Sequence, residues 1–240
     1  MGLVRYVAAF LFVIALPIAI ITTNVRIVVN EPHTYSYAID HYDGPKTTGI
    51  SRDQLIDGSA ELRDYFNNDQ RDLFVRVNQD GQSASLFNAR ESAHLRDVKT
   101  LFQQSFRVQE ASVIFILAYI VAVFIWAREG TMRTLAKQVL ISSALALAVL
   151  AIGGAIAASG FDQSFDQFHQ IAFDNDLWQL DPTQDHLIQM FPEQFWQDLT
   201  LWVGLGSMAE LGVFAIGSAI YLGLTRKSPF RFSFAAGAPA

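Results

Sequence analysis

Apolar residues are concentrated in four long runs along this chain, and polar residues dominate between them. Each run is close to the roughly 17 to 25 residues that a helix needs to cross a hydrocarbon core about 30 Å thick. A backbone inside that core must satisfy its own hydrogen bonds, so each run is expected to form a helix. The pattern therefore predicts four membrane spans, built on the runs Val4–Ile21, Ala111–Ala127, Leu135–Ala158 and Leu199–Leu224.

The first run has the position of a secretory signal, because it stands at the start of the chain behind Arg5. A cleaved signal ends in a small-x-small pattern. This run instead ends in the stretch from Ile20 to Arg26, which reads IITTNVR. We therefore expect a retained helix.

Basic residues flanking the four runs predict the orientation, because Lys and Arg are retained on the cytoplasmic side and short loops report this most clearly. They stand ahead of span 1, beside the short connection between spans 2 and 3, and after span 4: Arg5, then Arg128, Arg133 and Lys137, then Arg226, Lys227 and Arg231. The second long loop has no Lys or Arg and eight acidic residues. Both termini are therefore predicted inside, and both long loops outside.

The predicted fold class is a mainly α membrane protein with four transmembrane helices, both termini cytoplasmic, and a small α+β extracytoplasmic lobe with a hairpin and amphipathic surface helices. The segments are a first span at 1–23, the outer lobe with its surface helix at 24–110, a second span at 111–127, a cytoplasmic turn at 128–134, a third span at 135–159, an outer amphipathic loop at 160–198, a fourth span at 199–224 and a cytoplasmic tail at 225–240.

The first outer loop has the pattern of a compact lobe. The stretch from Asn30 to Gly49 is rich in turn residues and reads as irregular. Ser51 to Gln54 has the form of a capping box that opens a short helix ending near Phe66. Alternating residues from Leu73 to Val77, a turn, and the run from Ser83 to Phe87 then predict a β-hairpin.

A second capping box, Asn88 to Glu91, opens a helix that carries His94. Four apolar residues follow at helical spacing: Leu95, Val98, Phe102 and Phe106. With a rise of about 1.5 Å per residue, a straight helix would carry His94 about 25 Å above Ala111. The amphipathic stripe therefore predicts a bent helix that lies along the membrane surface.

The second outer loop repeats this pattern around His169. Apolar residues recur there at helical spacing, which predicts another interfacial helix: Phe161, Phe165, Phe168 and Ala172. Asp181 followed by Pro182 predicts a further helix start, with Asp as the N-cap and Pro at the first helical position. Three tryptophans are positioned as interfacial anchors: Trp178, Trp196 and Trp202.

Composition narrows the possible functions. The formal net charge of −6 provides no basic surface, so no nucleic-acid partner is expected. The absence of cysteine excludes a disulfide and a thiol nucleophile. The sequence also contains no Walker, Rossmann or nucleophile-elbow pattern.

His94 and His169 are the candidate chemical pair, because of the five histidines only these lie on amphipathic helices from different loops. Together they could act as a general base and as an acid or electrostatic partner. A histidine at an apolar boundary can equally be a satisfied interfacial residue. Asp97 is one helical turn from His94, so we expect its carboxylate to orient that imidazole.

Two other site types have weaker support. A zinc site with His94 and His169 lacks the H-E-x-x-H or Cys/His spacing, so no metal is expected. Glu210 is the only carboxylate inside a predicted span, where a charge often has a function. A single carboxylate without a partner is thin support for transport.

Two stretches resemble the lipoprotein intramolecular transacylase family, Lit, and the four-span layout matches as well. The stretches are Glu91-x-x-His94-Leu95-x-Asp97-Val98-Lys99 and Phe168-His169-x-Ile171-x-Phe173-x-Asn175-x-x-Trp178-x-Leu180-Asp181-Pro182-x-x-Asp185-x-Leu187-Ile188-x-Met190-Phe191-Pro192. The resemblance covers most of the chain, and the second motif is specific because it fixes aromatic, His, Asn, Trp, Pro and Asp positions together.

The resemblance implies an acyltransferase of the bacterial cell membrane whose active face is extracytoplasmic. Such an enzyme moves the sn-2 acyl chain of a diacylglyceryl-cysteine to the cysteine α-amino group and yields a lyso-form lipoprotein. Its partners are membrane lipid and the lipid-modified N-terminal cysteine of lipoproteins, and it needs no cofactor. The catalytic roles carry over to His94 and His169, and supporting roles to Asp97, Asn175, Trp178 and Asp185.

Two other functions are compatible with the same sequence. A non-catalytic membrane sensor or assembly factor would use the outer lobe to bind a partner, and its histidines would only tune packing. A transporter would need Glu210 to line a polar path between spans. Placement of Glu210 toward lipid would argue against transport.

Overall fold

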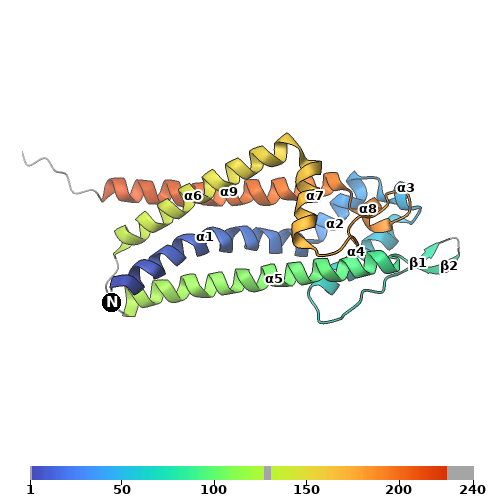
Figure 1. The fold of residues 1–240 in the computed structure, drawn as a ribbon, viewed down its shortest axis with the longest axis horizontal. Helices are drawn as coiled ribbons and strands as arrows, with labels where there is room; N and C mark the ends of the chain where they lie inside the picture. The colour runs from blue at the N-terminus through green and yellow to red at the C-terminus, as the bar shows by residue number, and fades with distance from the viewer. Residues whose placement is uncertain (1, 80, 127–130, 226–240) are drawn as a thin grey trace, which may run out of the picture.

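Four long helices run side by side as a bundle, and a smaller lobe caps one end of it in the computed structural model (Figure 1). The structure describes residues 2–79, 81–126 and 131–225. The bundle helices are α1 (Gly2–Asn30), α5 (Ala89–Ile120), which continues as the π-helical segment η1 (Val121–Trp126), α6 (Met132–Ser159) and α9 (Glu193–Leu224). The N-terminal end of α1 and the C-terminal end of α9 lie at the same end of the bundle, opposite the lobe.

The outer surface of the bundle is apolar. Val149 and Val213 are 68% and 71% exposed, and Ile114 and Leu117 are similarly open. A soluble bundle would bury side chains of this kind, whereas lipid can cover them. All four helices are long and apolar enough to cross a membrane. The predicted fold class, a mainly α protein with four membrane helices and a small sheet, is confirmed; the orientation stays a prediction.

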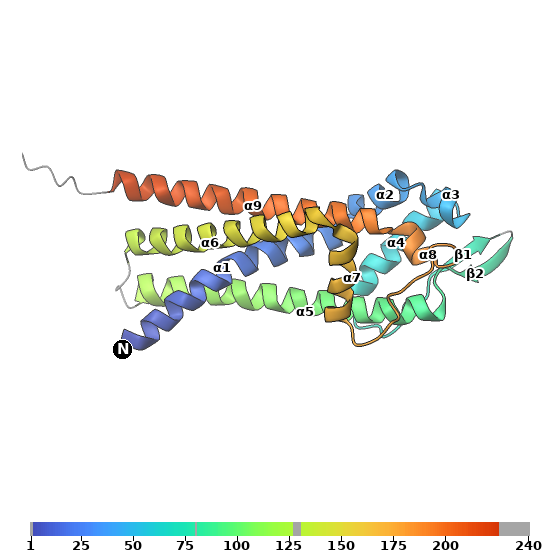
Figure 2. The ribbon, with the colours of Figure 1, turned by 45° about the horizontal axis from the view of Figure 1, so that its top comes forward.

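Helix α5 is continuous from the lobe into the bundle, so the predicted bend toward the membrane surface is wrong (Figure 2). The apolar stripe on its first turns does not need the membrane to cover it. Leu95 and Phe106 are 2% and 7% exposed because they belong to the core of the lobe. At about 1.5 Å per residue, His94 therefore lies about 25 Å along the helix from Ala111.

In the part of the chain that the structure describes, the first loop contributes three helices and a hairpin to the lobe, packed against the start of α5. They are α2 (Pro32–His41), α3 (Gly44–Thr48), α4 (Arg52–Phe66), β1 (Arg76–Gln79) and β2 (Gln82–Ser85). The strands pair antiparallel, with Arg76 opposite Ser85. The hairpin was predicted. The prediction that the stretch from Asn30 to Gly49 is irregular is wrong, because α2 and α3 lie within it. Pro32 occupies the first turn of α2, where a missing N–H costs little, and Ala38 and Ile39 are fully buried.

The two predicted capping boxes have different outcomes. Asn88 and Glu91 form the reciprocal pair at the start of α5. Ser51 precedes α4 as predicted but makes no side-chain cap. The Gln54 side-chain oxygen instead accepts the backbone N–H of Asn78, which attaches the hairpin to α4. Burial of the apolar face of α4, rather than a capping box, therefore stabilises this helix.

The second loop contains α7 (Phe161–Ala172) and the short helix α8 (His186–Met190). Helix α7 crosses the bundle axis steeply in both views, at the level where the lobe begins (Figures 1 and 2). The helix start predicted at Asp181 and Pro182 is wrong. The Asp181 carboxylate accepts the N–H and hydroxyl of Thr183 in a turn, and the helix begins after Asp185.

Several of the basic residues that predict the orientation are not described by the structure. Arg128, Arg226, Lys227 and Arg231, with most of the predicted turn at 128–134 and of the tail at 225–240, lie outside the described residues.

Candidate active site

Two histidines from distant parts of the chain lie next to each other at the junction of bundle and lobe. His94 is on the second turn of α5, and His169 is near the end of α7. Their ring centroids are 6.1 Å apart, and each residue is only 7% exposed. The crossing direction of α7 brings the second histidine to the first. The structure therefore unites the pair that the sequence singled out.

The His94 imidazole is buried, and its surroundings are mostly apolar. The ring of Phe173 meets it edge-on, with centroids 5.2 Å apart. Its Nδ1 atom has no hydrogen-bond partner among the described residues. Burial, with a smaller contribution from nearby His169, lowers the pKa of His94 from 6.5 to about 4, although Asp97 opposes the shift. His94 is therefore a neutral imidazole at neutral pH.

The His169 imidazole has a defined tautomer. Its Nδ1 lies 2.8 Å from the carbonyl oxygen of Phe165, one helical turn earlier. A carbonyl oxygen only accepts, so in this bond Nδ1 must carry the hydrogen. In the neutral ring the lone pair is then on Nε2. Burial lowers the pKa of His169, and the Phe165 hydrogen bond and Asp166 partly offset the effect.

The carboxylate of Asp97 does not orient His94 directly, which corrects the expected contact. Its Oδ2 accepts a hydrogen bond from the Nδ2 of Asn175 at 3.0 Å. The Oδ1 of Asn175 in turn accepts the backbone N–H of Leu177 at 3.0 Å. Asp97 and Asn175 thus fasten the second loop to α5, just before the loop reaches Trp178.

Asp185 and Glu91 make a second fastening between the two loops. The Oδ1 of Asp185 accepts from the side-chain amide of Asn88 at 2.6 Å, and Oε1 of Glu91 accepts the N–H of Leu187 at 2.6 Å. Glu91 is 1% exposed, and burial raises its pKa. Its capping role was predicted, but its contact with Leu187 was missed because no local pattern reports it.

Arg90 was also missed by the sequence reasoning. Its Nη2 donates to the carbonyl oxygen of Asp176 at 2.7 Å, so it holds the loop immediately before Trp178. The Trp178 indole stacks on His169 with centroids 4.9 Å apart. The hydrogen bond between His169 and the Phe165 carbonyl could have been predicted from the sequence. Phe165 stands four residues before His169, so the two are neighbours on one face of a helix.

The remaining histidines and Glu210 lie elsewhere. The His33 side chain is 91% exposed and pairs with Glu31, His41 stacks on Tyr37, and His186 contacts the carbonyl of Leu86. Among the described residues no group of three or more His, Cys, Asp or Glu side chains could hold a metal ion. Glu210 is exposed on the bundle surface rather than directed between helices, which argues against a polar path there.

The regions that form this site also match a known protein family. The profile described as "Lipoprotein intramolecular transacylase Lit" matches residues 10–196, which include both histidines and both fastened loops. The chain belongs to the Lit family. As a Lit family member it is a membrane protein of four apolar helices, and transferase activity and lipoprotein modification fit the name of the family.

Solved structures of a Lit protein have the same fold. Lit from Bacillus cereus superposes with a TM-score of 0.77 and 19% identity, over 93% of this chain and 98% of that one. A histidine-to-alanine variant of the same protein gives a TM-score of 0.73 at 18% identity, over 95% and 97% of the two chains. An uncharacterized protein of Aquifex aeolicus is 29% identical over 120 residues, half of this chain and half of that protein's length.

Proposed function

We propose that this protein is a lipoprotein intramolecular transacylase that moves the sn-2 acyl chain of a diacylglyceryl-cysteine to the cysteine α-amino group. The observation that carries the proposal is the adjacency of two buried histidines, 6.1 Å apart, at the base of the lobe. Membership of the Lit family supports the reaction class. We infer that the substrate is the lipid-modified N-terminal cysteine of bacterial lipoproteins, held at the extracytoplasmic face of the cell membrane.

The reaction makes modest demands on the protein. The amine and the ester belong to one molecule, so proximity supplies much of the acceleration once the substrate is folded correctly. The amine nitrogen attacks the ester carbonyl, a C–N bond forms and the bond to the sn-2 oxygen breaks. A proton leaves the nitrogen and arrives at the glycerol oxygen. One group that accepts and then returns this proton, together with a hydrogen-bond donor for the oxyanion, is sufficient for these steps.

The tautomer of His169 favours it as the general base. Its Nδ1–H is occupied by the Phe165 carbonyl, so Nε2 is the atom that accepts the proton of the amine. His94, also neutral, then stabilises the tetrahedral oxyanion by N–H donation, and His169 returns the proton to the glycerol oxygen. Two cationic histidines at this separation would repel each other, and burial avoids that state.

The apolar face of α7 is suited to the acyl chains of such a substrate. Ile171 and Phe168 are 86% and 49% exposed, two and one residues from His169 in sequence. Exposed apolar side chains on an amphipathic helix favour contact with lipid. We infer that the acyl chains lie along this face while the ester reaches the histidines.

Mass spectrometry of the N-terminal lipopeptide of a reporter lipoprotein tests the proposal. The reporter is coexpressed with the wild-type protein, with His94→Ala or with His169→Ala, and His41→Ala serves as a matched control outside the pair. We expect the N-acyl lyso form with wild type and control, and unchanged diacylglyceryl-cysteine with both site variants. Unchanged lipopeptide with a correctly inserted wild type would instead favour the non-catalytic sensor or assembly factor.

A further inference from the structure

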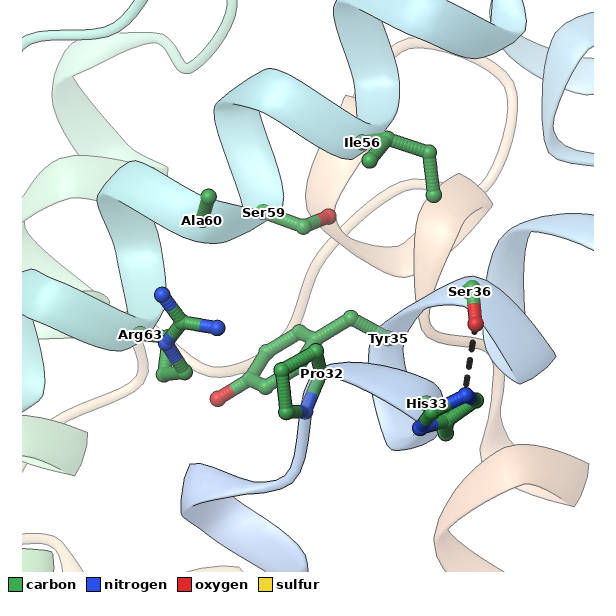
Figure 3. A pocket seen from close by; sticks show the side chains of 8 residues that line it. All are labelled: Pro32, His33, Tyr35, Ser36, Ile56, Ser59, Ala60 and Arg63. Atoms are coloured by element: carbon green, nitrogen blue, oxygen red, sulfur yellow. Dashed lines mark hydrogen bonds between the residues drawn. The ribbon is translucent and has the colours of Figure 1, made fainter.

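A cavity of about 170 Å³ lies between α2 and α4 on the lobe, built from residues that the catalytic pair does not use (Figure 3). Pro32 and Tyr35 of α2 and Ile56 of α4 give it apolar walls, and Ser59 and Arg63 of α4 add polar groups. A cavity of roughly 150 Å³ accommodates a benzene ring. This one therefore fits a small group, such as a three-carbon polyol, but not a whole lipid.

The Ser59 side chain lines this cavity, and its hydroxyl is unsatisfied. The residue is 1% exposed, and its Oγ has no hydrogen-bond partner among the described residues. A helical hydroxyl commonly bonds the carbonyl one turn earlier, as Thr48 does with Gly44 at 2.7 Å. A buried hydroxyl without a partner is costly, so it marks a position where a ligand or a water is expected.

Arg63 supplies a cationic group one helical turn from Ser59 on the same face. Its Nε and Nη2 lie 3.4 and 3.2 Å from one oxygen of the adjacent Asp64, whose side chain is 71% exposed. Such a solvated pair is weak. Within the part of the chain that the structure describes, the side-chain hydrogen bonds of Arg63 use Nε and Nη2 and leave Nη1 unused. The guanidinium therefore retains donors for an anion.

Arg63 and Ser59 lie at different heights along the membrane normal. We place the level of the Arg26–Glu110 ion pair, 2.8 Å long, above the hydrocarbon because charges are costly inside it, and α1 ends only one turn later. Asn30 at that end bonds Asn67 at 2.7 Å, just after the last turn of α4. Because α4 runs back toward α1, Arg63 is near the membrane end of the cavity and Ser59 is about 6 Å farther out.

We propose that this cavity binds the headgroup of an anionic glycerophospholipid with a polyol headgroup, such as phosphatidylglycerol. A lipid presents its phosphate first and its headgroup alcohol farther out, which is the order of Arg63 and Ser59. The phosphate accepts from the guanidinium, and a headgroup hydroxyl pairs with the Ser59 hydroxyl. The apolar walls disfavour an ammonium at that position, because a buried charge costs more than a buried hydroxyl.

Lipid titration of the detergent-purified full chain tests this site independently of any acyl transfer. Dioleoyl phosphatidylglycerol, phosphatidylcholine and phosphatidylethanolamine are compared by native mass spectrometry, and sn-glycerol 1-phosphate is tested as a soluble competitor. The variants are Ser59→Ala and Arg63→Gln. Arg107→Gln is the matched control, since it removes the same charge from an exposed position of α5.

We expect phosphatidylglycerol to bind at least about fivefold more tightly than the other two lipids. Arg63→Gln should remove that preference, and Ser59→Ala should weaken phosphatidylglycerol binding by about threefold to tenfold while leaving the unfolding temperature of the lipid-free protein no lower. Equal affinity for the three lipids, or an equal loss in Arg107→Gln, would overturn the proposal. Unchanged affinity in Ser59→Ala would also overturn it, because water rather than the headgroup would then satisfy the hydroxyl. Binding of glycerol phosphate as tight as that of the lipid would refute a membrane source.

Discussion

The Trp178 indole and the His169 imidazole form a stack with centroids 4.9 Å apart and planes 29° apart. Phe165 meets the same imidazole edge-on at 4.3 Å. His169 is thereby held between a helix residue and a loop residue, with its Nδ1–H on a backbone carbonyl. The orientation of His169 consequently depends on a loop that Arg90, Asn175 and Asp185 attach to the start of α5 and its cap.

Trp178→Ala is expected to lower acyl-transfer turnover by about tenfold, with a smaller effect on substrate affinity. Aromatic stacking contributes about 0.5 to 1.5 kcal/mol, and its loss frees the ring and admits water. The pKa of His169 should then move up toward 6.5. Turnover of a lipopeptide substrate and the imidazole pKa from NMR check this. Trp178→Phe keeps the ring contact and should retain most activity; equal defects in both variants would contradict stacking as the cause.

The histidine pair should make stability fall in mild acid. For His94 the folded pKa is about 4, below the 6.5 of the unfolded chain. Between these values the unfolded state binds more protons, so the free energy of unfolding decreases as pH is lowered from 6.5, by up to about 1.4 kcal/mol per pH unit. This contribution is fully present above pH 6.5. Unfolding temperatures of wild type and His94→Asn from pH 4.5 to 7.5 measure it, and parallel curves would contradict burial of a neutral imidazole.

Replacing the two carboxylates that attach the second loop, Asp185 and Asp97, should affect stability and activity differently. Asp185 is 7% exposed and also accepts the N–H of Asp181 at 2.7 Å, so Asp185→Ala leaves two donors unpaired and should cost about 1 to 3 kcal/mol of stability. Asp97 pairs with the exposed Asn175, so Asp97→Ala should cost less than about 1 kcal/mol but slow turnover by loosening the Trp178 loop. Denaturation and turnover assays on both variants check this. Normal turnover in Asp97→Ala would exclude a positioning role.

Glu210 is expected to be dispensable for acyl transfer. It lies exposed on the surface of α9, about one turn from the buried Ser207. Glu210→Gln should therefore give wild-type amounts of lyso-form lipopeptide and an unfolding temperature within the usual range of surface changes. A strong loss of product would assign this carboxylate a role in the membrane that its exposure does not explain.

The family motif and helical spacing selected His94 and His169, but only the tertiary structure related them. Their adjacency depends on the crossing direction of α7, which no local pattern encodes. The same is true of Asp97. It lies three residues from His94, so local spacing favoured a contact between them, yet the loop placed Asn175 on its carboxylate instead. Spacing along a helix gives proximity, whereas the choice of partner depends on what packs against that face.

By itself, the sequence determined the four membrane helices, the hairpin and the capping box at Asn88, because the length of apolar runs, alternation and cap chemistry act within a few residues. The tertiary structure decided that α5 stays straight and that Asn30 to Gly49 is helical. In both cases neighbouring elements of the lobe bury the apolar side chains. The local pattern had instead predicted that the membrane covers those of α5 and that Asn30 to Gly49 forms turns. Long-range burial outweighs local preference here, because most helix stability in proteins comes from tertiary packing of an apolar face.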